Sequence, residues 1–140
     1  EILSLCYQVF LRDNFEGTEP ELKPHTDRGW RFHRYVLEEG DPLIRYALFQ
    51  ALEEERGTES HSAMWTDWPE EYRIPTSDAV REFQRRKMHR VRFFLYLQWL
   101  AAEQLGVLRK KTAEAGMPIG LYHDLALGSD RHGARCARRG

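Results

Sequence analysis

The strongest constraint on the fold is a stretch of helical periodicity over residues 77–116 that stops abruptly at Gly116. Ser77 is a favourable helix cap. A straight helix of this length would measure about 57 Å, which is long for a compact domain. We therefore predict a long helix over 77–116, bent between Lys87 and Arg92. Its expected apolar core positions, on more than one side, are Val91, Phe94, Leu95, Leu97, Trp99 or Gln98, Leu100, Ala101, Leu105 and Leu108.

The residues after Gly116 do not suit a helix. Pro118 lacks an amide hydrogen, and Gly120 and Gly128 are poor helix formers. The same stretch holds an apolar run made of Met117, Ile119, Leu121, Leu125 and Leu127. We predict a buried strand over 117–128. A helix followed by such a strand is typical of α/β units, whose strand ends carry the chemistry.

The N-terminal part, residues 1–57, is predicted to be helical. The first helix is expected over 2–15, followed by an exposed Pro- and Gly-rich loop over 16–29. A short helix over 30–39 should end at Gly40, and a second should cover 41–57. The buried stripe expected in that second helix is Leu43, Ala47 or Tyr46, Leu48, Phe49 and Leu52, and Glu53, Glu54 and Glu55 are expected to form a solvated end.

Residues 58–76 have no helical period and are predicted to be a loop rich in Trp and Pro. It contains Trp65 and Trp68, for which two interpretations remain open. Either the two indoles anchor the loop on the core, or one faces solvent and stacks on a ligand such as a sugar ring.

Charge is distributed unevenly along the chain. Residues 1–76 hold 8 Lys/Arg and 16 Asp/Glu, whereas residues 77–140 hold 13 and 6, so the two parts carry net charges of −8 and +7. A basic segment with interleaved aromatics, such as 81–92, is what a nucleic-acid binder would use. An acidic part of the same chain favours internal pairing instead, and we expect no nucleic-acid partner.

Cys6 and Cys136 lie far apart and lack the spacing of a zinc site, which indicates reduced thiols in a cytoplasmic protein. No leader and no apolar stretch of membrane-spanning length is present in the sequence, so we expect no membrane association. No motif for a metal, nucleotide or other cofactor appears, and we predict neither a metal nor a cofactor.

Three segments carry a family resemblance: MWTDWPEEYRIPTSDAVREF, RVRFFLYLQWLAAEQL and AGMPIGLYHDLALGSDRHGA. Together with LIRYALFQAL they resemble the central part of bacterial 4-alpha-glucanotransferases, the amylomaltase or disproportionating enzymes of the alpha-amylase clan. The resemblance covers about residues 43–134. It implies that the chain, 1–140, is a single partial domain: a mostly α fragment of a (β/α)8 TIM-type barrel with helical insertions, ending in one β-strand.

The resemblance also implies an activity. Such enzymes transfer α-1,4-glucan segments between maltooligosaccharides by a retaining mechanism with a nucleophilic carboxylate and an acid/base carboxylate. In the family these carboxylates follow later strands, so no catalytic residue is assigned in this chain, and the isolated 140 residues are predicted to be inactive. The alternative is a non-catalytic helical protein-interaction module.

Two candidate site residues lie at the end of the predicted strand. Asp124 matches the family aspartate near the donor sugar and is predicted to support the site or bind substrate. His123 stands where the family usually has Arg, which replaces a permanent cation by a largely neutral group. The basic tail, 129–140, departs from the family pattern after Ala134, and we assign no function to its arginines.

Overall fold

The computed structural model describes residues 2–59 and 64–120. These residues are mostly helical and include a small antiparallel sheet, which confirms the mostly α prediction. The elements in order are α1 (Ile2–Asn14), β1 (Phe15–Glu16), β2 (Lys23–Pro24), α2 (Asp27–Glu59), the 3-10 helix η1 (Trp65–Asp67), α3 (Glu70–Arg73), α4 (Asp78–Arg86) and α5 (Met88–Glu114).

Helix α2 bends at Gly40, where the backbone has φ 60° and ψ −148°. Side chains with a Cβ rarely adopt this region, whereas glycine does so without strain. The two helices predicted over 30–39 and 41–57 therefore exist as two arms joined at this residue. The first arm begins three residues earlier than predicted, at Asp27.

The long helix predicted over 77–116 divides at Lys87, within the predicted bend. Lys87 has φ −112° and ψ 24°, which ends α4 and starts α5 in a new direction. Ser77 caps α4 as expected, since its hydroxyl accepts a hydrogen bond from the Val80 amide at 3.2 Å. Gly116, with φ 72°, follows the end of α5.

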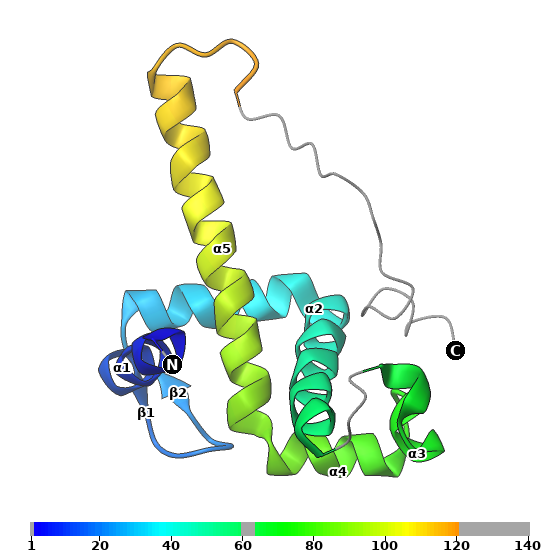
Figure 1. The fold of residues 1–140 in the computed structure, drawn as a ribbon. Helices are drawn as coiled ribbons and strands as arrows, with labels where there is room; N and C mark the ends of the chain where they lie inside the picture. The colour runs from blue at the N-terminus through cyan, green and yellow to red at the C-terminus, as the bar shows by residue number, and fades with distance from the viewer. Residues whose placement is uncertain (1, 60–63, 121–140) are drawn as a thin grey trace.

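The core lies where α1 and both arms of α2 pack against the first half of α5 (Figure 1). Aromatic rings fill its centre. Phe10 of α1 contacts Trp99 of α5 with ring centroids 5.2 Å apart, and Phe32 of α2 contacts the same indole at 5.6 Å. The buried stripe predicted for α2 is confirmed: Leu43, Ala47, Leu48, Phe49 and Leu52 are all buried.

The segment predicted as an exposed loop over 16–29 is more ordered than expected. Phe15 and Glu16 pair with Pro24 and Lys23 in an antiparallel ladder. The connecting turn also places Glu19 against Arg92 of α5 in an ion pair. This contact between charges distant in sequence holds the turn on the helix, and no local pattern could reveal it.

The predicted loop over 58–76 also contains regular structure. It includes the 3-10 helix η1 and the single-turn helix α3, which was not predicted. Pro69 precedes α3 and Glu70 and Glu71 occupy its first turn, an arrangement that favours a helix start because acidic side chains complement the N-terminal dipole.

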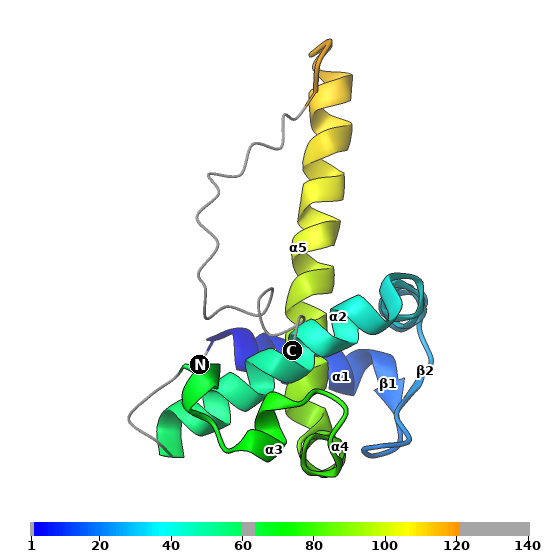
Figure 2. The same cartoon turned by 90° about the vertical axis from the view of Figure 1, so that its right-hand side faces the viewer.

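The second half of α5 extends beyond most of the other described elements and is bordered mainly by the start of α2 (Figures 1 and 2). Leu105, Val107 and Leu108 have exposed fractions of 48%, 54% and 45%. The prediction that Leu105 and Leu108 are buried is therefore wrong for the described residues. Their helical spacing marks them as an apolar face, but α1 and α2 cover only the first half of the helix.

The predicted strand over 117–128 is described only at its start. Residues 117–120 form a bend, with Gly120 at φ 69° and Ile119 84% exposed. The strand therefore does not begin at Met117 as predicted. Residues 121–128 and the tail, 129–140, lie outside the described residues, and the strand stays a prediction there.

Candidate functional site

The two tryptophans predicted as sugar-stacking candidates both pack on the hydrophobic core. Trp68 is 3% exposed, and its ring packs on Phe49 with centroids 5.5 Å apart. Trp65 is partly buried against the same core. Nearby, the Arg56 guanidinium lies 3.9 Å from the centroid of the Tyr72 ring. These contacts anchor the loop on the core, and stacking of Trp65 or Trp68 on a sugar stays a prediction.

Asp124 and His123, the other predicted site residues, lie outside the described residues. Their supporting role in a glucan site therefore stays a prediction. Among the residues that are described, the polar side chains gather in two places. One is the junction of α2 with α4 and α5, and the other is the crossing of α1, α2 and α5.

The first cluster joins the acidic end of α2 to the basic helices α4 and α5. Glu55 pairs with Arg86 at 3.0 Å and with Lys87, and Glu54 pairs with Arg90. The prediction of a solvated end holds for Glu54, whose side chain is exposed, but is wrong for Glu55, whose side chain is only 14% exposed. Both carboxylates bind cations from the other half of the chain. The predicted internal pairing of the two halves is confirmed here, while the absence of a nucleic-acid partner stays a prediction.

This pairing makes stability depend on pH. Partial burial opposes ionisation of Glu55, but its contacts with Lys87 and Arg86 outweigh that effect and lower the pKa of its carboxyl. Because the pKa of Glu55 is lower in the folded state than in the unfolded state, its ionised carboxylate stabilises the protein at pH values above the unfolded-state pKa. This stabilisation is lost as the pH falls through the folded-state pKa. As the pH is lowered from about 5 to about 3, we therefore expect the free energy of unfolding to fall less steeply in Glu55→Gln than in the unmodified chain.

Urea unfolding followed by circular dichroism at several pH values measures this slope. Glu82→Gln is the matched control, because among the described residues Glu82 pairs with Arg85 of its own helix and both side chains are exposed. An unchanged slope in Glu55→Gln would contradict the assignment.

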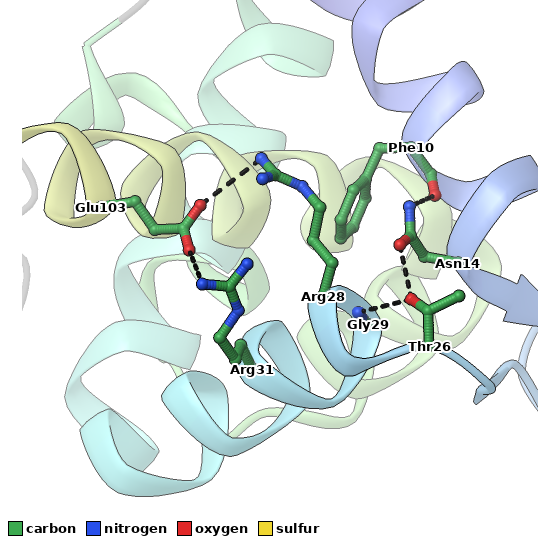
Figure 3. A network of polar contacts seen from close by, with 7 residues as sticks. All are labelled: Phe10, Asn14, Thr26, Arg28, Gly29, Arg31 and Glu103. Carbon is green, nitrogen blue, oxygen red and sulfur yellow. Dashed lines mark hydrogen bonds and ion pairs between the residues drawn. The ribbon is translucent and has the colours of Figure 1, made fainter.

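The second cluster fixes the crossing of the helices through neutral hydrogen bonds (Figure 3). Asn14 is buried at the end of α1, and its side-chain amide donates to the Phe10 carbonyl at 2.8 Å. The Thr26 hydroxyl donates to the Asn14 side-chain oxygen at 2.6 Å and accepts from the Gly29 amide at 3.1 Å. Thr26 thereby caps α2 and attaches its first turn to the end of α1.

Charged side chains continue this cluster toward α5. Glu103 lies 3.4 Å from Arg28 and 3.5 Å from Arg31, the two arginines coming from the start of α2 (Figure 3). The Arg28 guanidinium also lies 5.0 Å from the centroid of the Trp99 ring, a cation–π contact. Sequence reasoning missed this group, because Arg28 and Glu103 are 75 positions apart and neither belongs to a motif.

Arg28 and Glu103 border an open hollow of about 460 Å³ beside the second half of α5. Its other lining residues include Leu100, Val107, Leu108 and Lys111. Among residues 2–59 and 64–120, no group of three or more His, Cys, Asp or Glu side chains could hold a metal ion. Within the same ranges, no helix has the length and apolarity needed to cross a membrane.

Comparison with known proteins decides the family. The sequence profile described as 4-alpha-glucanotransferase matches residues 4–138, nearly the whole chain. The chain belongs to the 4-alpha-glucanotransferase family. This confirms the resemblance based on the segments around Trp68, Trp99 and Gly120, and it extends the match to α1 and β1.

Several relatives of the chain are named 4-alpha-glucanotransferase. A protein of Haemophilus influenzae is 30% identical over 74% of the chain, and one of Mycobacterium tuberculosis is 34% identical over 69%. A protein of Aquifex aeolicus is 29% identical over 85%. The matches cover 15%, 13% and 20% of those relatives, so the chain spans only a small part of their length.

Proposed function

We propose that these 140 residues serve as part of a 4-alpha-glucanotransferase that moves α-1,4-glucan segments between maltooligosaccharides. The observation that carries this proposal is the family match over residues 4–138, supported by relatives that bear this name. The reaction is a retaining transfer in which a covalent glycosyl-enzyme forms on one carboxylate and a second carboxylate acts as acid and then base.

Within such an enzyme, the described helices form a layer that positions the start of a barrel strand. Helix α5 is followed by the bend at 117–120, and the predicted strand would come after this bend. The strand, over the remainder of 117–128, would present Asp124 and His123 at its end, where TIM-barrel sites lie. Asp124 would then bind a sugar hydroxyl or organise the site, and His123 would provide a neutral donor beside it.

We expect the 140-residue chain by itself to release no glucose from maltotriose above a buffer blank. The reason is chemical: the retaining transfer needs two carboxylates about 5–5.5 Å apart across the sugar, and the family resemblance assigns neither to this chain. Chromatography of the products checks the expectation. A ladder of longer oligosaccharides formed by the 140 residues would show that it is wrong.

The proposed function itself is tested with the complete translated product. Sequencing the DNA on both sides of these 140 codons would define the open frame, and the protein made from it would be given maltotriose. Formation of glucose together with longer maltooligosaccharides supports the proposal. A complete product that carries out no transfer, or a frame that encodes no further carboxylate-bearing strands, overturns it.

A further inference from the structure

We propose that Trp30 and His33, on the first arm of α2, form a surface contact for an α-1,4-glucan that is separate from the reacting centre. The inference rests on the proposed function for its ligand class. It starts from the exposure of the tryptophans: Trp30 is 55% exposed, whereas Trp68 and Trp99 are each 3% exposed. Among the four tryptophans, Trp30 of α2 is therefore the one classed as exposed, since Trp65 is only partly exposed.

The two rings lie next to each other in a fixed arrangement. The His33 ring stands perpendicular to the indole, with centroids 5.7 Å apart and an interplanar angle of 89°. Both side chains are exposed and come from successive turns of one helix. The Trp30 amide donates to the Thr26 carbonyl at 2.9 Å, and Thr26 is held by Asn14. The backbone that carries the indole is therefore anchored before any ligand arrives, which reduces the entropy lost on binding.

This arrangement suits a pyranose ring. A glucose unit has a flat face of C–H groups and an equatorial rim of hydroxyls, so its binding site needs a flat apolar surface bordered by hydrogen-bonding groups. An exposed indole provides the flat apolar surface, and the two nitrogens of a neighbouring imidazole provide a donor and an acceptor. Arg34, also exposed on this arm, carries further donors and lies 3.9 Å from the Glu38 carboxylate.

A protein partner fits this place less well. Sites for protein partners are contiguous apolar patches of several hundred Å². Around Trp30 the exposed neighbours one turn away on the helix are polar: Asp27, His33 and Arg34, with the exposed Leu37 only beyond them. The apolar face that fits a protein better is on the second half of α5, with its exposed leucines.

Titration of the 140-residue chain with maltoheptaose, followed by tryptophan fluorescence, tests the proposal. A single stacked sugar at an open site should give a dissociation constant in the millimolar range. We expect Trp30→Ala to weaken binding at least fivefold and His33→Ala to weaken it less. Both side chains are exposed, so circular dichroism should show an unchanged fold.

The matched control is Leu37→Ala, which removes another exposed apolar side chain, 68% exposed on the same arm of α2, and should leave binding within a factor of two. Chemical shifts of the remaining tryptophan side-chain N–H groups give a second readout that does not depend on the Trp30 emission. No saturable response of the unmodified chain, or equal binding by Trp30→Ala, overturns the inference. The proposed function is tested by a different measurement, the transfer of glucan segments by the complete translated product.

Discussion

Replacing Trp99 by alanine is expected to lower the free energy of unfolding by about 3–5 kcal/mol, the cost typical of truncating a buried aromatic side chain. The indole is 3% exposed and contacts Phe10, Phe32 and Tyr96. It also supports the Arg28 guanidinium that pairs with Glu103. Since a domain is stable by about 5–15 kcal/mol in total, the loss should leave a large unfolded fraction at 37 °C.

Urea unfolding monitored by circular dichroism at 222 nm measures this change. Trp30→Ala is the matched control: it removes the same atoms from an exposed position and should cost less than about 1 kcal/mol. Similar losses in the two variants would show that the ring cluster at Trp99 is not the centre of the core.

Gly29→Ala is expected to destabilise the protein by about 1–3 kcal/mol, although alanine is the better helix former. A Cβ at Gly29 would lie 2.6 Å from the backbone oxygen of Asn14 and 3.1 Å from the Cβ of Pro24. The first of these neighbours belongs to the main chain at the end of α1, so it cannot rotate away. The added methyl group would push α2 from α1 and strain the hydrogen bonds around Thr26.

Replacing Gly106 by alanine should change the free energy of unfolding in the opposite direction. Gly106 lies inside α5, and a Cβ there would meet no atom of the described residues within 4 Å apart from the helix's own backbone. Alanine should therefore stabilise the helix by up to about 1 kcal/mol through its higher propensity. Thermal and urea unfolding of the two variants measure the pair. Equal effects of the two substitutions would contradict the close approach of α1 and α2 at Gly29.

Local signals in the sequence were sufficient for most helix boundaries. Ser77 predicted the start of α4, and glycine predicted both the junction at Gly40 and the stop after α5. These features depend on backbone preferences of single residues and their immediate neighbours. The buried stripe of the second arm of α2 followed from its period for the same reason.

Features that depend on distant residues could not be predicted. The pairing of Glu19 with Arg92 and of Glu103 with Arg28 joins segments whose approach is set by tertiary packing. The exposure of Leu105 has a related cause. Apolar residues at helical spacing indicate that a helix face can be buried, but they do not indicate whether another element covers it. For the candidate site, only the motifs of the family resemblance pointed to Asp124 and His123.

The two halves of helix α5 lie in different environments, although they belong to one continuous helix. Its first half is enclosed by α1 and α2, whereas among the described residues its second half is bordered mainly by the start of α2. Amide protons should therefore exchange with deuterated solvent at rates graded along the helix, slowest near Tyr96 and fastest near Lys111, because opening of the outer turns disrupts few apolar contacts. The outer turns would then fray and reform many times before the inner ones open once.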